Sequence, residues 1–207
     1  MMTKTFYLMR HGRTRFNEQG RIQGACDSPL TEEGIAQAKA AKVYFDQEGI
    51  QFDRVYSSTQ ERACDTAELA TGRTDYIRLK GIKEWDFGSF EAHQEYLNPH
   101  LYREDGSGYR DYFVAYGGES NVQVYSRMRD TIRDILEETA ADATLLFVSH
   151  GGAIGQFFRN VTKNPPQLSR RISNCAIFKI RYDEGEFEVA SIYDPLDQTF
   201  IYERGKE

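Results

Sequence analysis

Two histidines of this sequence come one residue after largely apolar runs, and one of them stands next to an arginine. Arg10 and His11 come after the run 6–9, and His150 comes shortly after the run 143–148. Guanidinium groups match phosphate oxygens in bidentate geometry, and a neutral imidazole can attack phosphorus. These residue types therefore indicate a site that binds a phosphate group and could accept it on a histidine.

A second arginine and a carboxylate extend this candidate set. Arg62 falls in the first turn of a helix expected after the short strand 54–57, where free backbone N–H groups also favour an anion. A leaving alcohol needs a proton, which Glu84 could supply as a general acid. Clustered arginines are costly without an anion to neutralise them, so the set again indicates phosphate chemistry.

The elements that would hold these residues alternate between strand-like and helix-like segments. Strands are expected at residues 5–9, 54–57, 76–79 and 143–148, with a closing hairpin at 175–182 and 187–193. Helices are expected at residues 32–47, 58–69, 120–136 and 153–161, with cap residues Thr31, Ser58 with Glu61, and Ser120 with Gln123. This alternation predicts an α/β fold with a mainly parallel sheet. Because ligands bind beyond the carboxyl ends of parallel strands, the two histidines and two arginines should lie at one edge.

Residues 84–117 differ from the rest of the chain. They are aromatic, polar and interrupted by glycines, which is typical of short helices and loops that cover a site. The aromatic residues of 96–116 are expected to serve mainly in packing, with an apolar wall for the organic part of a substrate as the alternative. His93 and His100 are expected to be surface or cover residues. We expect one domain over residues 1–207, with 84–117 as an insert that covers the site.

The composition argues against several classes of protein. Of the 207 residues, 40% are hydrophobic and 28% are charged, and the net charge of −6 argues against a general binder of nucleic acid or anionic membranes. The cysteines Cys26, Cys64 and Cys175 lie far apart and indicate reduced thiols. No secretory segment and no apolar run near the roughly 20 residues of a membrane span is seen, so a cytoplasmic protein is expected.

Five motifs follow one another in a characteristic order: RHGRTRFN…GRIQGACDSPLTEEGIAQA, YSSTQERACDTAE, EWDFGSFE, GGES and VSHGG. In this order and at these separations they resemble the histidine phosphatase superfamily, the phosphoglycerate-mutase-like enzymes, over essentially the whole chain. RHG alone would be a weak signal, whereas the ordered set is specific. The resemblance implies a three-layer α/β/α sandwich with a mainly parallel central sheet and a small helical and loop cover segment.

Carried over to matching positions, the resemblance implies a role for each candidate residue. His11 would be the nucleophile that forms a phosphohistidine, and Glu84 would be the proton donor that later activates water. The transferring phosphoryl group would be bound by Arg10, Arg62 and His150. The resemblance implies neither a metal nor an organic cofactor.

Two further positions match the family's pattern, and two features depart from it. Asn17 matches an asparagine that contacts phosphate, and the backbone near Gly24 matches a loop that lines the substrate entrance. Arg13 stands where members more often carry Glu, Gln or Lys. The Arg-His-Tyr that follows the acid in glycolytic mutases is absent, because the segment here reads KEWDFGSFEAHQ. This difference favours a phosphatase over a phosphoglycerate mutase.

Three functions are consistent with these residues. The leading prediction is a metal-independent phosphomonoester hydrolase of the histidine acid phosphatase type, which acts through phosphorylated His11 on a small phosphorylated metabolite. The first alternative is a mutase of the same chemistry, and the second is a catalytically silent sensor of a phosphorylated ligand. As partners we expect a small-molecule phosphoester and neither nucleic acid nor membrane, and we leave a homodimer open.

Overall fold

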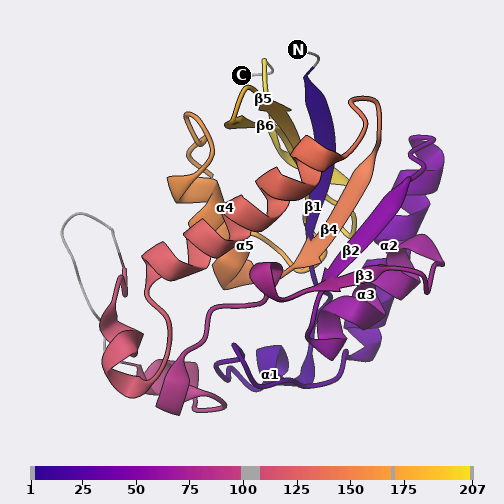
Figure 1. Cartoon of the computed structure of the whole chain (residues 1–207). Helices are drawn as coiled ribbons and strands as arrows, with labels where there is room; N and C mark the ends of the chain where they lie inside the picture. The colour runs from indigo at the N-terminus through magenta and orange to yellow at the C-terminus, as the bar shows by residue number, and fades with distance from the viewer. Residues whose placement is uncertain (1–2, 99–107, 169–170, 206–207) are drawn as a thin grey trace.

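The strands of the computed structural model form one mixed seven-stranded sheet in the order β3-β2-β4-β1-β5-β6-β7 (Figure 1). The structure describes residues 3–98, 108–168 and 171–205. The strands are β1 (Lys4–Arg10), β2 (Arg54–Ser58), β3 (Ile77–Leu79), β4 (Leu145–Ser149), β5 (Ile177–Asp183), β6 (Glu186–Asp194) and β7 (Thr199–Glu203). The α-helices are α1 (Arg15–Glu18), α2 (Glu32–Gln47), α3 (Glu61–Thr71), α4 (Asn121–Glu138) and α5 (Gly151–Asn160). The short 3-10 helices are η1 (Lys80–Ile82), η2 (Gly88–Phe90), η3 (Glu95–Leu97) and η4 (Tyr112–Tyr116).

The strands β3, β2, β4 and β1 run parallel and bring their carboxyl ends to one edge. β1 and β2 both pair with β4, with Arg10 opposite Ser149 and Ser57 opposite Val148. On the other side of β1, the strands β5, β6 and β7 form an antiparallel meander. The predicted α/β fold with a mainly parallel sheet is confirmed. The closing hairpin is present as β5 and β6, and β7 is a strand beyond those predicted.

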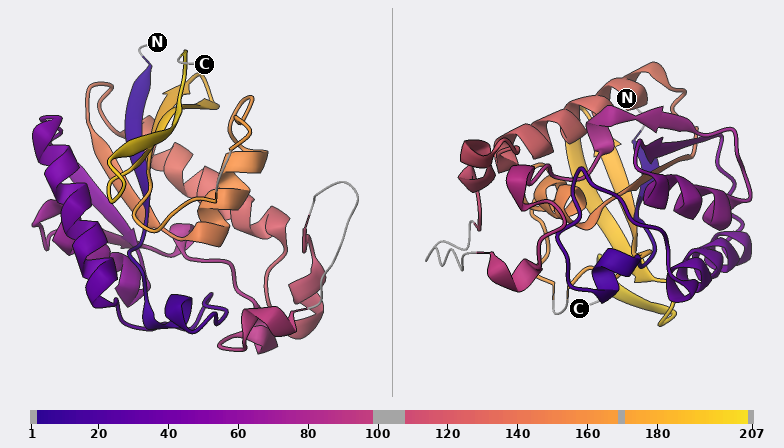
Figure 2. Two further views of the ribbon diagram at one scale, coloured as in Figure 1. Left: turned by 180° about the vertical axis from the view of Figure 1, so that it is seen from behind. Right: turned by 90° about the horizontal axis from the view of Figure 1, so that it is seen from below.

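Alternating side chains of β1 supply the core on both faces of the sheet. Phe6 and Leu8 pack with residues of α4 and α5, whereas Tyr7 and Met9 pack with residues of α2 and α3. Burying a side chain of this size contributes roughly 1.5–3 kcal/mol. The two helix pairs cover opposite faces of the sheet in Figure 2, so the expected three-layer α/β/α arrangement is confirmed.

Two of the three predicted helix caps are present. Thr31 Oγ1 accepts a hydrogen bond from Gly34 N at the start of α2, and Ser120 and Gln123 form a reciprocal capping box at the start of α4. These side chains satisfy backbone N–H groups that have no partner in the first turn of a helix.

The third predicted cap, Ser58 with Glu61, is wrong. Helix α3 begins at Glu61 after Gln60, without a side-chain cap. Ser58 instead ends strand β2 opposite Leu79, and its hydroxyl contacts His150. Because the sheet pairing extends through Ser58, its side chain is committed to the carboxyl edge of the sheet and not to the helix.

The cover segment, residues 84–117, contains η2, η3 and η4. Figure 1 shows its described parts, 84–98 and 108–117, at the carboxyl end of the parallel strands, at the opposite end of the molecule from the two termini. Phe113 is fully buried and makes edge-on ring contacts with Trp85, Phe87 and Phe90. These contacts support a packing role for aromatic residues of this segment.

The other predictions for this segment have mixed outcomes. Tyr96 is 73% exposed and Tyr116 is 44% exposed, so packing does not account for every aromatic residue there. His93 is exposed, as expected for a surface or cover residue. His100 lies outside the described residues, as does the whole of 99–107.

The three cysteines, which were expected to be reduced, are Cys26, Cys64 and Cys175. All are unpaired thiols, and the last two are buried.

Every helix in the part of the chain that the structure describes is too short or too polar to cross a lipid bilayer.

Candidate active site at the strand ends

The carboxyl ends of β1 and β4 place two histidines against each other. His11 directly follows β1, and His150 directly follows β4. Their ring centroids are 5.1 Å apart, and the rings are tilted by 55°. His11 is 4% exposed, and His150 is fully buried. The parallel register of the two strands thus brings together residues that lie far apart in the sequence.

His11 is a neutral imidazole with one nitrogen unprotonated. Its Nδ1 lies 2.7 Å from the Gly12 carbonyl oxygen, which can only accept, so Nδ1 carries the proton and Nε2 keeps its lone pair. Burial lowers the pKa of His11 well below its usual value, and the charges of Arg62 and Arg10 lower it further. An imidazole in this state is the form that can attack phosphorus.

His150 adopts the opposite tautomer. Arg62 Nε donates to His150 Nδ1 at 3.1 Å, so Nδ1 is the acceptor and Nε2 donates to Ser58 Oγ at 2.6 Å. Ser58 Oγ in turn donates to Gln60 Oε1 at 3.0 Å. Burial, followed by the charge of Arg62, lowers the pKa of His150 well below its usual value. Both ring nitrogens of this neutral histidine are therefore fixed by the protein.

Arg62 lies in the first turn of α3, as predicted, and is fully buried. Each of its N–H groups has an acceptor. Besides His150, the acceptors are Asp27 Oδ1 at 2.8 Å and the carbonyl oxygens of Gln23, Gly24 and Cys26 at 3.3, 3.0 and 2.9 Å. A phosphoryl group that binds Arg62 must therefore replace some of these contacts with the loop 23–27.

Arg10, the last residue of β1, carries a buried donor without a partner. Its Nη1 donates to the Ile172 carbonyl oxygen at 2.7 Å, while Nε has no hydrogen-bond partner among the described residues. A Cβ atom at Gly151 would lie 3.0 Å from this nitrogen, so Nε faces the chain next to His150. An unsatisfied buried donor is costly, and an anion at this position would relieve the cost.

Glu84 reaches the same region from the cover segment. It is 6% exposed, its Oε1 accepts from Trp85 N and Ala153 N at 2.7 Å each, and its Oε2 accepts from Gly152 N at 2.9 Å. The carboxylate therefore lies at the N-terminus of α5, the helix that follows His150. A Cβ atom at Gly152 would lie 2.7 Å from Glu84 Oε1, so this approach requires a glycine there.

Asn17 is joined to the backbone of His11 and not to its ring. Asn17 Oδ1 accepts from Thr14 N at 3.2 Å in the capping box of α1, and from Asn174 Nδ2 at 3.3 Å. Asn174 Nδ2 also lies 3.0 Å from the carbonyl oxygen of His11. The structure thus places Asn17 beside the strand end, where its described contacts hold the loop after His11.

Gly24 lies in the loop that surrounds Arg62 and joins it to the cover segment. Its carbonyl oxygen accepts from Arg62 Nη2 at 3.0 Å and from Gln60 Nε2 at 2.8 Å, and its N–H donates to Glu91 Oε2 at 3.0 Å. A Cβ atom at Gly24 would lie 2.1 Å from the Trp85 carbonyl oxygen. Only glycine fits between the strand ends and the cover segment at this point.

Arg13, the departure from the family's pattern near the histidine, has a carboxylate partner. Its Nη1 lies 2.7 Å from Glu33 Oε2, and the two side chains are 37% and 44% exposed. An ion pair with this exposure contributes little to stability. The positive charge of Arg13 is thus paired with Glu33, and no bound ligand is needed to explain it.

Three residues of this cluster are absent from the predicted site residues. Ser58 and Gln60 orient His150, and Asp27 pairs with Arg62. Ser58 stands at the end of a strand just as the histidines do, so its position was a usable signal. Asp27 has no such signal, because only the fold brings its loop to Arg62.

Within residues 3–98, 108–168 and 171–205 there is no group of three His, Cys, Asp or Glu side chains that could hold a metal ion.

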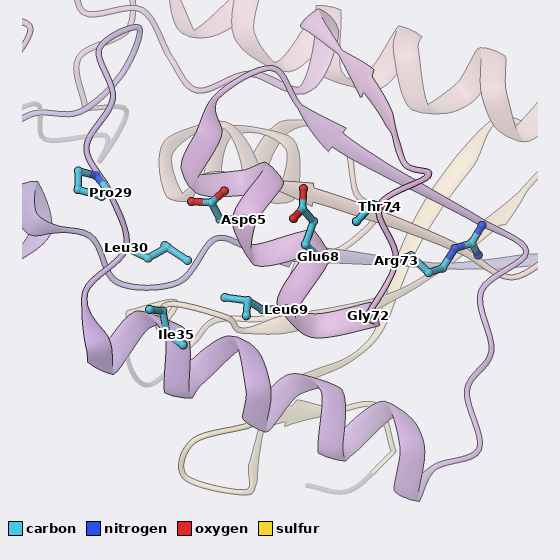
Figure 3. A pocket seen from close by; sticks show the side chains of 9 residues that line it. All are labelled: Pro29, Leu30, Ile35, Asp65, Glu68, Leu69, Gly72, Arg73 and Thr74. Atoms are coloured by element: carbon cyan, nitrogen blue, oxygen red, sulfur yellow. The ribbon is translucent and has the colours of Figure 1, made fainter.

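A cavity elsewhere in the molecule is separate from the cluster at the strand ends. It has a volume of about 490 Å³, is shown in Figure 3, lies between α2 and α3 and is lined by residues that include Leu30, Asp65 and Leu69. Its lining shares no residue with the cluster at the strand ends.

Comparisons with known proteins identify the family of this chain. The family model of the histidine phosphatase superfamily (branch 1) matches residues 6–195. A probable phosphoglycerate mutase of Proteus mirabilis (strain HI4320), GpmB, is 34% identical over 184 residues, which are 85% of this chain and 84% of the relative. The crystal structure of phosphoglycerate mutase from Bacillus anthracis str. Sterne has a TM-score of 0.76 at 26% identity and covers 91% of this chain and 92% of that one. Phosphoserine phosphatase from Entamoeba histolytica, in complex with 3-phosphoglyceric acid, has a TM-score of 0.76 at 27% identity, with 91% and 96% covered. The chain therefore belongs to the histidine phosphatase superfamily, branch 1.

Proposed function

We propose that this protein is a phosphomonoester hydrolase that works through a phosphohistidine at His11. The state of His11 carries the proposal. It is a buried neutral imidazole whose Nδ1 is held by the Gly12 carbonyl oxygen, whose Nε2 has a lone pair, and whose charged neighbours are Arg62 and Arg10. A nucleophile between two guanidinium groups suits an anionic electrophile such as a phosphate ester.

In the first step, His11 Nε2 attacks phosphorus. The P–N bond forms while the ester P–O bond breaks, and the leaving oxygen takes a proton from Glu84, which must therefore enter this step as the carboxylic acid. Arg10, Arg62 and His150 bind the phosphoryl oxygens, over which the charge of the transition state is spread. In the second step, water attacks the phosphohistidine and gives its proton to Glu84. The P–N bond breaks, and inorganic phosphate leaves.

Phosphate binding requires a rearrangement of two of these groups. Arg62 must exchange carbonyl contacts of the loop 23–27 for phosphoryl oxygens. His150 Nδ1 accepts a hydrogen bond from Arg62, so it can donate to a phosphoryl oxygen only after gaining a proton. Neither change involves a metal ion, and we propose a metal-independent reaction.

Small phosphorylated metabolites are the substrates that we propose. The E. histolytica phosphatase was solved with 3-phosphoglyceric acid and, in a mutant form, with phosphoserine. Phosphorylated three-carbon acids therefore stand first in a panel that should also contain sugar phosphates, nucleotides and phosphopeptides.

Mutase activity is the second candidate, because sequence relatives are named as probable phosphoglycerate mutases. Against it stands the segment that follows Glu84. An indole such as Trp85 is uncharged and a carboxyl group such as Asp86 is never a cation, so neither pairs with a second acidic group of a substrate. With 3-phosphoglycerate, a phosphatase releases inorganic phosphate, whereas a mutase yields the 2-phospho isomer.

The replacement His11→Ala tests the proposal. We expect phosphate release from 4-nitrophenyl phosphate to fall by more than roughly 10⁴-fold, because the nucleophile is gone. The circular dichroism spectrum should be unchanged, and an acid-labile phosphohistidine should be trapped only in the wild type. Activity should persist in excess chelator. Full activity of the variant would overturn the mechanism, and a wild type that turns over no phosphoester would support the silent sensor.

A further inference from the structure

Arg127 of α4 uses three of its five N–H groups to bind backbone carbonyl oxygens at and before Glu84, and the other two to bind Glu119. Its Nη1 donates to the carbonyl oxygens of Gly81 and Lys83, and its Nη2 donates to that of Glu84, each at 2.8 Å. Its Nε and Nη2 also donate to the two carboxylate oxygens of Glu119 at 2.9 Å each. A guanidinium has five N–H donors in a planar fork, and here all five have acceptors.

Glu119, from the motif GGES, binds the same segment further along. Its Oε2 accepts from Asp86 N at 3.2 Å, and its backbone N–H donates to the Asp86 carbonyl oxygen at 2.8 Å. Its own carbonyl oxygen accepts from Trp85 Nε1 at 2.6 Å. Lys83 Nζ lies 3.8 Å from the Glu119 carboxylate. Each residue from 83 to 86 is therefore bound to Arg127, to Glu119 or to both.

The segment 83–87 has no regular secondary structure that could hold Glu84 in place. It connects η1, which ends at Ile82, to η2, which begins at Gly88. The carbonyl groups of Lys83 and Glu84 therefore take their hydrogen bonds from the side chain of Arg127 and not from a helix or a strand. A displacement of about 1 Å in a catalytic group can cost a factor of about 10² in rate, so the contacts that hold this segment bear on function.

The Arg127–Glu119 pair is well shielded from solvent. Both side chains are 17% exposed. Burial raises the pKa of Glu119, but the hydrogen bond and charge of Arg127, together with the charge of Lys83, outweigh burial, and the net shift is downward. Glu119 is therefore ionised at neutral pH, and the bidentate pair is charge-assisted.

We propose that Arg127 and Glu119 are positioning residues for Glu84, which hold the backbone of residues 83–86 so that the Glu84 carboxyl group meets the leaving oxygen. This inference rests on the phosphoryl transfer proposed above. Neither residue touches the substrate. Lysine at position 127 would keep the charge but not the planar fork, so it cannot serve three carbonyl oxygens and both oxygens of Glu119 at once.

The replacement Arg127→Lys tests the proposal with two phosphate esters that differ in their need for a proton. An alkyl phosphate has a strongly basic leaving oxygen that requires a general acid, whereas 2,4-dinitrophenyl phosphate releases a weakly basic phenolate. The ratio kcat/KM reports phosphorylation of His11 for both. We expect kcat/KM to fall about 30-fold to 100-fold for the alkyl phosphate and less than about threefold for the dinitrophenyl ester.

Two further variants set the scale of this effect. Glu84→Gln removes the acid itself and should show the same selectivity with a larger loss. Arg133→Lys changes an arginine on the same helix whose partners Asp130 and Asp134 lie at the surface, and it should leave both substrates unchanged. The quotient of the two kcat/KM values, measured on one sample, does not depend on the fraction of folded protein.

The outcomes separate this inference from the function on which it rests. Equal losses for both esters with Arg127→Lys, or no loss for either, would overturn the positioning role while phosphohistidine formation stands. If that variant is insoluble, the same quotient measured on Glu119→Gln decides, with a selective loss expected. Failure of the proposed function itself would show differently, as a wild type that hydrolyses neither ester.

Discussion

The residues at the strand ends, Arg10, His11, Arg62 and His150, form the floor of the candidate site. This floor and the cover segment position their side chains in different ways. On the floor, His11 and His150 follow neighbouring parallel strands, so the register of β1 and β4 fixes their separation. In the cover, Glu84 lies in a segment without regular structure, and side chains of α4 and of the loop before it hold that segment. A sheet keeps its register through many single substitutions, whereas a segment held by a few side-chain contacts can shift when one of them is lost. We therefore expect the acid to be more easily displaced than the nucleophile.

The two regions also differ in charge. The floor holds the fully buried Arg62 and the half-buried Arg10 beside two neutral imidazoles. The cover brings the carboxylates of Glu84 and Glu91, and backbone N–H groups bind both of them. A phosphate ester thus meets cations at its phosphoryl end and a carboxyl group at its leaving oxygen, which is the order that the proposed reaction needs.

The largest loss of activity should follow from a substitution of Arg62. We expect Arg62→Lys to lower kcat/KM by about 10³-fold, since one ammonium group cannot replace a buried bidentate donor. The same change removes the hydrogen bonds that Arg62 donates to Asp27 and to carbonyl oxygens of its loop, so the free energy of unfolding should fall by about 3 kcal/mol. Steady-state kinetics and urea unfolding measure the two effects.

The neighbour of Arg62 gives the matched control. Asp27→Asn keeps an oxygen that can accept from Arg62 while it removes the charge. Its effect on kcat/KM should stay below about tenfold, because the proposed phosphate contacts remain. A loss as large as that of Arg62→Lys would mean that the arginine acts by holding the loop 23–27 and not by binding phosphate.

The contrast between floor and cover also explains what the sequence could reveal. An apolar strand followed at once by His11 predicts both the strand and the place of the side chain, because the carboxyl ends of parallel strands share one edge. The expectation that His11 and His150 lie at one edge of the sheet needs no more than this rule. The cap predicted at Ser58 failed because a strand end and a helix start compete for the same serine, and sheet pairing with β3 decides between them.

Contacts in the cover segment could not be derived in the same way. Glu84 could be identified because a carboxylate stands at the position that matches the family's motif. No sequence pattern predicts that Arg127 binds its segment, since the contact is between a helix and an irregular loop. Likewise, no local pattern shows that Glu91 accepts hydrogen bonds from the loop at Gly24. Such contacts depend on how irregular segments pack, and the sequence carries no repeat that specifies it.

The junction between floor and cover can be weakened at Glu91. Its carboxylate accepts from the backbone N–H groups of Gly24, Ala25, Cys26 and Phe87 at 2.8–3.0 Å. In Glu91→Gln one oxygen becomes an NH₂ group that faces donors, so we expect a loss of about 1–3 kcal/mol in stability. KM should rise about fivefold with little change in kcat, because the loop at the entrance loosens while the strand ends stay in place.

Glu95→Gln is the matched control for Glu91, since it changes an exposed glutamate of the same segment. Steady-state kinetics and urea unfolding should show no difference from the wild type. A change in kcat with an unaltered KM in Glu91→Gln would contradict the assignment, because it would place the effect at the reacting groups and not at the entrance loop.

The smallest effect concerns the floor alone and its dependence on pH. The folded-state pKa of His11 lies well below the value of about 6.5 that a histidine has in an unfolded chain. As the pH falls below about 6.5, this histidine becomes protonated in the unfolded chain but stays neutral in the folded chain. The free energy of unfolding therefore decreases by about 1.4 kcal/mol per pH unit for each such histidine. The decrease stops where the pH reaches the folded-state pKa. Above about 6.5 this residue causes no pH dependence.

Urea unfolding of the wild type and of His11→Asn between about pH 7.5 and pH 5.5 isolates this contribution, because the carboxylates titrate alike in both proteins. The wild type should lose about 1 kcal/mol more than the variant over this range. His93→Asn, which removes an exposed histidine of the cover, should follow the wild type. Equal pH dependence in wild type and His11→Asn would mean that the floor accepts a protonated His11, and the neutral nucleophile on which the proposed reaction depends would be lost.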